Sequence, residues 1–131
     1  MFSYLCYMKN IIFIITLLLI SLTAAAQEQL GNGLVIDKSV HDFGDILLES
    51  GPVSCTFTIE NKGEKPAVIY NVVSSCGCTD VKWTREPIRP GGKGTISVTY
   101  SNDEGAYPFD KNLTIYVSEI KKPLILKVRG I

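Results

Sequence analysis

Apolar and polar residues alternate strictly in short segments of this chain, and this pattern limits the fold more than any other feature. Residues 53–60 are the clearest case, because every second side chain is apolar or a cysteine. A period of two is typical of a strand with one buried face. The side chains expected to face the core are Val53, Cys55, Phe57 and Ile59.

Further strands are expected where short runs rich in Val, Ile and Tyr lie between turn residues. These runs cover residues 34–37, 67–73, 81–83, 95–100, 112–117 and 124–129. No helical periodicity follows residue 26. Seven or eight short strands in roughly 100 residues predict an all-β, Ig-like β-sandwich over residues 34–131. The Cys…Trp…Cys order of antibody domains is absent, because Trp83 follows Cys55, Cys76 and Cys78.

Residues 1–26 have the composition of a secretory signal peptide. The run from Ile11 to Leu22 is apolar apart from two hydroxyl residues, Lys9 precedes it, and Ala24–Ala26 form a small-residue cleavage site before Gln27. The run is shorter than the roughly 20 residues that a membrane span needs. We therefore expect cleavage, export to the periplasm or the exterior, and no stable membrane anchor afterwards.

Two features of the N-terminal region complete this interpretation. Residues 27–33 are polar and contain glycine, so we expect a flexible leader there. Met8 is followed directly by Lys9 and would make a better start than Met1, so we expect translation to begin at Met8.

The charge balance after the signal excludes functions that depend on a strong electrostatic field. Residues 27–131 contain 12 Lys and Arg against 13 Asp and Glu. This balance offers no footprint for nucleic acid or for an anionic membrane surface. The only histidine is His41, and no carboxylate pair, Ser–His or Cys–His arrangement, or cofactor loop is visible. We expect no catalytic residues and no cofactor, and we interpret the chain as a non-enzymatic module that binds or scaffolds another envelope protein. Its oligomeric state stays open.

The run Ser74–Thr79 holds the clustered reactive side chains of the sequence, Cys76 and Cys78. Two thiols separated by one glycine can close a disulfide or bind one soft metal ion such as Cu(I). One of them can instead bridge to a distant cysteine, and both can simply pack as small side chains. Gly77 would permit the sharp or left-handed backbone that these uses need.

A thiol site at Cys76 and Cys78, for Cu(I) binding or thiol–disulfide exchange, is therefore the alternative function. Two arguments place it second. No His or Met lies nearby in the sequence, and two thiolates alone make an incomplete zinc site. Catalytic thiol pairs commonly use a helix N-terminus to lower the cysteine pKa, whereas residues 81–83 are expected to form a strand.

Cys55 is expected to be a buried free thiol. If residues 53–60 and 67–73 form a hairpin, Cys76 lies about three residues beyond the level of Cys55, or roughly 10 Å along a strand. A disulfide needs Cα atoms within about 7 Å. Cys76 and Cys78 would then pair with each other or remain a dithiol. Placement of the two strands in different sheets would remove the basis of this distance.

Five sequence elements together carry a family resemblance. In chain order they are Phe43-Gly44-Asp45-Ile46, Phe57-x-x-x-Asn61-x-Gly63, Ser75-Cys76-Gly77-Cys78-Thr79, Pro87-Ile88-x-Pro90-Gly91 and Ile96-x-Val98-x-Tyr100. With them the chain resembles the bacterial family known as domain of unknown function 1573, over residues 34–130. That family is similar to the Ig-like domains of Hydin and the major sperm protein. The resemblance implies an Ig-like fold and an exported protein of the kind typical of the Bacteroidota, and it implies no activity.

Overall fold

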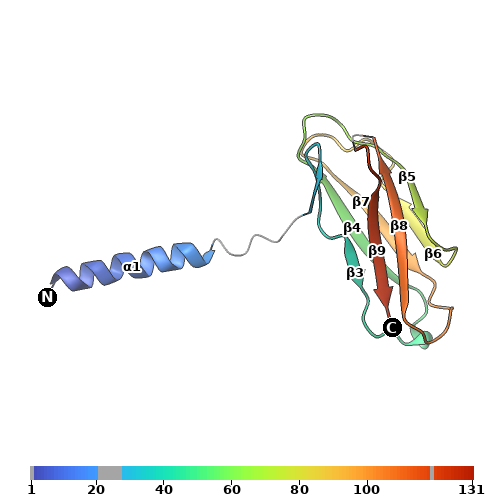
Figure 1. Cartoon of the computed structure of the whole chain (residues 1–131), viewed down its shortest axis with the longest axis horizontal. Helices are drawn as coiled ribbons and strands as arrows, with labels where there is room; N and C mark the ends of the chain where they lie inside the picture. Colours follow the sequence, from blue (N-terminus) through green and yellow to red (C-terminus); the bar gives the residue numbers. More distant parts are fainter. Residues whose placement is uncertain (1, 21–27, 119) are drawn as a thin grey trace.

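The computed structural model describes residues 2–20, 28–118 and 120–131. Over these residues the chain forms one α-helix, one short 3-10 helix and nine strands (Figure 1). The helices are α1 (Phe2–Ile20) and η1 (Leu48–Ser50). The strands are β1 (Glu28–Gly31), β2 (Leu34–Ile36), β3 (Val40–Asp42), β4 (Val53–Asn61), β5 (Ile69–Ser74), β6 (Thr79–Trp83), β7 (Lys93–Tyr100), β8 (Phe109–Val117) and β9 (Leu124–Gly130).

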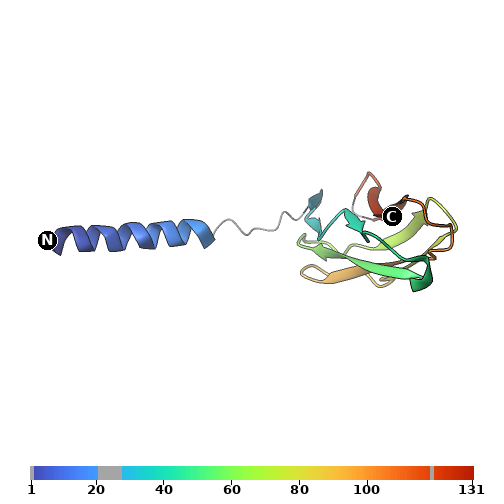
Figure 2. The ribbon, with the colours of Figure 1, turned by 90° about the horizontal axis from the view of Figure 1, so that it is seen from below.

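The strands form two sheets that face each other, which confirms the predicted β-sandwich. The five-stranded sheet has the order β1-β2-β4-β7-β6, and the four-stranded sheet has the order β3-β9-β8-β5. Neighbouring strands are antiparallel, except that β3 runs parallel to β9. Figure 2 shows the two sheets as separate layers. Because β4 and β5 lie in different layers, the chain crosses between the sheets after Asn61 and again between β5 and β6.

The core lies between the layers and follows the alternation of the sequence. On β4 the inward series is Val53, Cys55, Phe57 and Ile59, and all but Val53 are buried. The other long strands contribute Ile96, Val98, Leu113, Ile115, Leu126 and Val128, each with no exposed surface. Tyr100 and Phe109 stack across the two layers with ring centroids 3.9 Å apart, which closes one end of the core.

Asn61 fixes the connection that leaves the five-stranded sheet. Its side chain is 1% exposed. Nδ2 donates to the carbonyl oxygens of Lys65 (2.7 Å) and Ile88 (2.9 Å), and Oδ1 accepts from the Gly63 amide (3.0 Å). A buried amide with all these partners ties the turn after β4 to the turn before β7. This role explains why asparagine stands at this position of the Phe57-x-x-x-Asn61-x-Gly63 element.

The outward face of the five-stranded sheet is covered by hydroxyl side chains. Ser54 and Thr99 hydrogen-bond across β4 and β7 at 2.8 Å. Longer contacts of 3.5 Å join Thr56 to Ser97 and Thr84 to Thr95. This face is therefore polar and already paired with itself, in contrast to the face of the other sheet described below.

We expected a flexible leader over residues 27–33, but strand β1 occupies Glu28–Gly31. Glu28–Gly31 pair with β2 through a turn in which Asn32 (φ 49°) and Gly33 (φ 80°) both have positive φ. An Asn-Gly pair with two positive φ values is the preferred two-residue hairpin turn, so the turn orders the segment before it. Gln27 lies outside the described residues.

The hairpin considered between residues 53–60 and 67–73 also does not form. β4 pairs with β2 and β7, whereas β5 pairs with β8 in the opposite sheet. The distance of Cys76 from Cys55 that was inferred from a hairpin therefore has no basis in this topology. Strand β3, three residues long, is a further element that the sequence pattern did not indicate.

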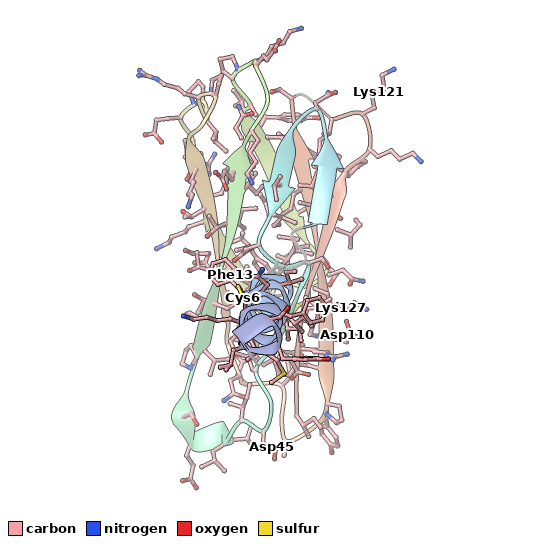
Figure 3. The ribbon with its side chains drawn as sticks, turned by 90° about the vertical axis from the view of Figure 1, so that its left-hand side faces the viewer. Cys6, Phe13, Asp45, Asp110, Lys121 and Lys127 are labelled. Atoms are coloured by element: carbon pink, nitrogen blue, oxygen red, sulfur yellow. A yellow bond between two sulfur atoms is a disulfide. The ribbon has the colours of Figure 1, made fainter. Side chains whose placement is uncertain are left out.

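Helix α1 contains most of the apolar run interpreted as a signal. Its described side chains are exposed, including Leu5, Phe13 and Ile14 at 62% or more. Figure 1 shows the helix standing away from the sheets, and Figure 3 views it end-on, with Cys6 and Phe13 labelled. Within the described part of the chain, no helix has the length and apolar character required to span a membrane. The proposed cleavage site at Ala24–Ala26 lies outside the described residues.

Candidate functional site

The Cys-Gly-Cys loop crosses from one sheet to the other at the end of β5. Ser75 extends the pairing of β5 with β8, because its amide donates to the Asn112 carbonyl (2.9 Å) and its hydroxyl accepts from the Asn112 amide (3.1 Å). The chain then enters β6, where the Cys78 carbonyl accepts from the Ser101 amide (2.9 Å). Both ends of the loop are thus held by strands of opposite sheets.

The structure joins Cys76 to Cys78 by a disulfide, with their Cα atoms 5.3 Å apart. Both cysteines are half-buried. The hydroxyl of the buried Thr79 lies 3.6 Å from Sγ of Cys76 and 3.8 Å from Sγ of Cys78. Of the sharp or left-handed backbone that Gly77 was expected to permit, the left-handed form is not adopted, because Gly77 does not have a positive φ. A Cβ placed on Gly77 would meet nothing within 4 Å.

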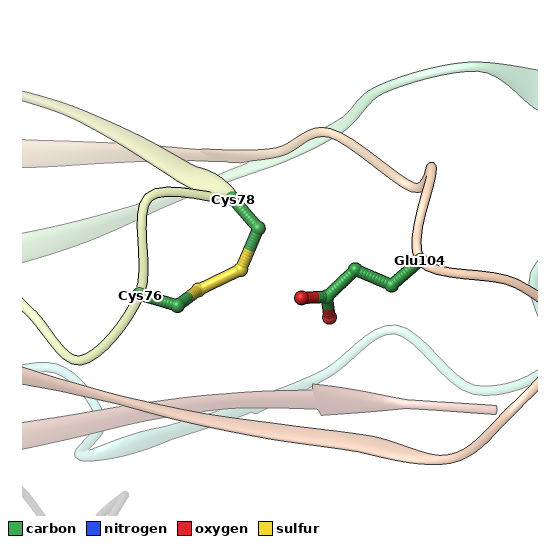
Figure 4. A group of neighbouring side chains, drawn as sticks. All are labelled: Cys76, Cys78 and Glu104. Atoms are coloured by element: carbon green, nitrogen blue, oxygen red, sulfur yellow. A yellow bond between two sulfur atoms is a disulfide. The ribbon is translucent and has the colours of Figure 1, made fainter.

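Glu104, from the connection between β7 and β8, brings a carboxylate to the sulfurs. One of its oxygens and the sulfurs of Cys76 and Cys78 all lie within 4.8 Å of one another. Figure 4 shows the carboxylate directed toward the disulfide. Sequence reasoning missed Glu104, because two complete strands, β6 and β7, separate it from the cysteines and it meets them only in the folded sandwich.

Two neighbours hold the Glu104 carboxylate in place. Oε2 accepts from the Tyr100 hydroxyl (3.2 Å) and pairs with Lys111 Nζ (2.8 Å). The side chain of Lys111 is only 18% exposed, because Lys111 belongs to the inward-facing series of β8. The Lys111 hydrogen bond is the main reason that the pKa of Glu104 lies below its ordinary value. Burial, reinforced by the charge of Glu104, raises the pKa of Tyr100.

The other residues singled out from the sequence lie apart from this cluster. Cys55 is a free thiol on the core face of β4, 8% exposed, and burial raises its pKa to about 11. His41 packs edge-on against Phe43 at 4.6 Å, and its Nδ1 lies 2.9 Å from Lys38 Nζ. Burial, followed by the Lys38 charge, lowers the pKa of His41. Neither residue reaches the disulfide cluster.

A second surface of interest is the free edge of the four-stranded sheet. The two sheets have four edge strands, namely β1, β3, β5 and β6. β1 and β3 have four residues or fewer, and β6 carries the charges of Asp80 and Lys82. β5 has six residues and no charged side chain. Short strands and charges are the usual protection of sheet edges, so β5 is the edge that lacks it.

Beside this edge, three exposed side chains and one half-buried tyrosine form an apolar cluster on the outer face of the sheet. We call Tyr70, Val73, Tyr116 and Ile125 the β5 patch. Thr114 pairs with Val73 on one side and Ile125 on the other, which places the three in one row. Tyr70 and Tyr116 lie next to that row with ring centroids 5.9 Å apart. Tyr70, Val73 and Ile125 are 61%, 47% and 51% exposed.

The remainder of the same face is charged and internally paired. Lys127 Nζ lies 3.3 Å from Asp110 Oδ2, a pair labelled in Figure 3, and Arg129 Nε donates to Asp42 Oδ2 at 2.9 Å. The outer face of the four-stranded sheet thus has two halves. The charged side chains of the polar half form ion pairs, whereas no other described residue packs over the apolar half, the β5 patch.

The comparison with known families decides the classification. A family model described as "Protein of unknown function (DUF1573)" matches residues 34–131. The chain belongs to this family. The earlier resemblance is therefore confirmed, and both the disulfide loop and the β5 patch lie within the DUF1573 domain. No curated protein matches the chain significantly.

Solved structures share the fold of this DUF1573 domain at low identity. A protein of unknown function from Porphyromonas gingivalis W83 has a TM-score of 0.65 at 17% identity, covering 84% of this chain and 50% of that one. The VesB protease of Vibrio cholerae has a TM-score of 0.59 at 19% identity, covering 76% and 32%. WR4, a C. elegans MSP family member, has a TM-score of 0.54 at 12% identity, covering 76% and 97%. The chain thus spans half or less of the two bacterial structures, and these likenesses show the fold alone.

Proposed function

We propose that this chain is an exported, non-enzymatic binding module that takes up an extended apolar segment of another envelope protein along strand β5. The observation that carries the proposal is the continuity of an uncharged free edge with the β5 patch. Natural sheets protect such edges, and an exposed apolar cluster beside one indicates an interaction surface. Export is supported by the apolar run of residues 11–22 and the small residues after it.

The geometry favours addition of a strand to β5. A segment that pairs with β5 gains main-chain hydrogen bonds, and its alternate side chains can reach the adjoining sheet face. One end of the edge is already used, because Trp83 Nε1 donates to the Ile69 carbonyl at 3.1 Å and the register shifts between Ile69 and Asn71. The proposed pairing therefore covers Asn71–Ser74, which include Val73 of the β5 patch.

The chemistry of the patch defines the partner. Two tyrosine rings and two aliphatic side chains suit an apolar or aromatic segment, and the tyrosine hydroxyls suit a partner that stays partly hydrated at its rim. The likeness to VesB supports a modular role, because this fold accounts for only 32% of that protease chain. A segment of a different envelope protein is the occupant that we propose.

Site-specific photo-crosslinking in living cells tests the proposal. A photoreactive phenylalanine replaces Tyr70, and a matched probe replaces Thr56 on the hydroxyl-covered face of the other sheet. We expect a crosslinked envelope protein from position 70 and none from position 56. Val73→Lys should remove the crosslink, because an ammonium group in the patch would lose hydration when the partner binds.

Three results would count against this function. Equal crosslinking from both positions would indicate random contact, and a crosslink unaffected by Val73→Lys would place the contact elsewhere. A product that contains only two copies of this chain would identify self-association instead of a partner. Circular dichroism of each variant separates these outcomes from loss of folding.

Thiol–disulfide exchange is the second candidate, favoured by the half-buried Cys76–Cys78 disulfide at a loop between sheets. It ranks second because strand β6, and not a helix, follows Cys78, so no helix N-terminus lowers the thiol pKa. A Cys78→Ser variant leaves Cys76 as the only thiol of the loop. Recovery of a mixed disulfide between Cys76 and an envelope protein, absent in Cys76→Ser/Cys78→Ser, would support exchange, and its absence would oppose it.

A further inference from the structure

The Cys76–Cys78 loop and Glu104 meet in a way that neither a structural disulfide nor a binding edge requires. A disulfide needs no carboxylate beside it, yet one Glu104 oxygen and the two sulfurs all lie within 4.8 Å of one another. Two thiolates and a carboxylate are all ligands of zinc in proteins. We infer that the reduced form of this loop is a binding site for a divalent, thiophilic cation of the zinc type, with Cys76, Cys78 and Glu104 as its three protein ligands.

The carboxylate is already oriented for this role. Both of its interactions, with Tyr100 and with Lys111, use Oε2. Oε1 has no hydrogen-bond partner among the described residues, and Figure 4 shows the carboxylate group facing the sulfurs. Hydrogen bonds to the far side of a ligating carboxylate are the usual outer support of a metal site. Tyr100 and Lys111 supply that support from two different strands.

The charges select a divalent ion. Two thiolates and one carboxylate carry three negative charges, and a divalent cation together with the adjacent Lys111 ammonium balances them. Cu(I) would leave one negative charge in a half-buried site and needs only the two soft sulfurs. With three protein ligands the fourth zinc position stays open to water, the arrangement typical of reactive or transfer sites and different from closed structural ones.

The distances require only a small rearrangement. Zn–S bonds of about 2.3 Å and Zn–O bonds of about 2.0–2.2 Å place tetrahedral ligands about 3.5–3.8 Å apart. Bringing the Glu104 oxygen to that distance from the sulfurs therefore needs a movement of about 1 Å, by the usual zinc geometry, while the sulfurs must separate from bonding distance to about 3.8 Å. The Glu104 side chain is 45% exposed and can move by that amount. The sulfurs separate in the same step, because their bond is broken by reduction.

The site is controlled by redox state. Two electrons and two protons from an external dithiol convert the Cys76–Cys78 disulfide into two thiols, and the dithiol leaves as its own disulfide. Binding of the cation then releases both thiol protons, because thiolates are the ligands. In the oxidised form the sulfurs are bonded to each other and cannot serve as ligands. The loop therefore binds the cation only after reduction, independently of whether the β5 edge has a partner.

The test is zinc binding by the purified protein produced from the whole chain, measured by competition with a chromogenic chelator. With a phosphine reductant we expect one zinc ion per chain, and without it none. Cys76→Ser/Cys78→Ser should abolish binding, and Glu104→Gln should weaken it at least about tenfold, since even outer-shell losses cost about 10–100-fold. Glu64→Gln, at the opposite end of the sandwich, is the matched control for loss of one negative charge and should have no effect.

Cobalt(II) provides a second readout that misfolding cannot imitate. The reduced wild-type protein should show thiolate-to-cobalt charge transfer and the intense visible bands of four-coordinate cobalt. Glu104→Gln should change the visible bands and keep charge transfer. Zinc binding that is equal in the oxidised and reduced protein would overturn the inference, as would binding that survives loss of both cysteines. Equal affinity of wild type and Glu104→Gln would show a two-thiolate site, the pattern expected for Cu(I), and would also overturn it.

Discussion

Replacement of Asn61 by alanine should be among the most damaging single changes in the domain. The variant loses the three side-chain hydrogen bonds to Gly63, Lys65 and Ile88. At about 1 kcal/mol for each hydrogen bond, the free energy of unfolding should fall by about 3 kcal/mol. A domain of this size has about 5–15 kcal/mol in total. A loss of that size lowers the melting temperature by about 12–24 °C, given about 4–8 °C per kcal/mol.

Urea denaturation followed by the fluorescence of Trp83, the only tryptophan, measures this loss. The midpoint should shift while the slope stays constant, because the surface exposed on unfolding hardly changes. Asn71→Ala is the matched control, since Asn71 is exposed on β5, and it should change the free energy of unfolding by less than about 0.5 kcal/mol. A loss below about 1 kcal/mol for Asn61→Ala would refute the role that we assign to this side chain.

Asn61→Asp tests the same bonds through pH. The aspartate would place an oxygen against the two carbonyls that Nδ2 now serves, in a site with 1% exposure. Burial and this repulsion raise the folded-state pKa of the new carboxyl above its unfolded value. Stability is therefore greatest below the unfolded pKa and declines as the pH rises toward the folded pKa. Equal stability of this variant, relative to wild type, at acid and neutral pH would contradict the reasoning.

Three other predictions concern two glycines, the Cys55 thiol and the expected cleavage of the signal. Gly63→Ala should lower the free energy of unfolding by more than about 2 kcal/mol, because the added Cβ would clash with the Asn32 carbonyl oxygen. Gly77→Ala should be tolerated, because a Cβ there would meet nothing within 4 Å. Thermal unfolding of both variants measures the difference. Cys55, with its pKa raised to about 11, is only about one-thousandth thiolate at pH 8, so iodoacetamide should modify it only after unfolding; rapid modification of the native protein would show an accessible thiol. Mass spectrometry of the exported protein should find a mature chain that begins at Gln27, and a product that retains residues 11–22 would indicate an anchored form instead.

The sequence was most informative where the fold depends on local periodicity. The alternation from Val53 to Ile59 predicted both β4 and its buried face, since a strand with one face in the core needs only its own residues to produce that pattern. Strand β3 could not be found in this way. It has three residues, and its existence depends on parallel pairing with β9 at the far end of the chain.

The site shows the same division between local and distant information. Cys76 and Cys78 are neighbours in sequence and were recognised at once. Their carboxylate partner was not, because Glu104 approaches them only when the two sheets pack. One signal could have pointed to it: extending the β8 alternation back from Leu113 puts Lys111 on the core side. A lone lysine in an inward series needs an acidic partner, and that partner is Glu104.

The short spacing of the disulfide also bears on how the chain avoids incorrect oxidation. Residues 27–131 contain three cysteines, which allow three possible pairings. Closure of a small ring costs less chain entropy than closure of a long loop, so Cys76 and Cys78 meet each other far more often than either meets Cys55. Once β4 packs, Cys55 is withdrawn from thiol exchange by burial. Oxidation of this local pair before the core forms would therefore leave Cys55 as a buried free thiol, although the number of cysteines is odd.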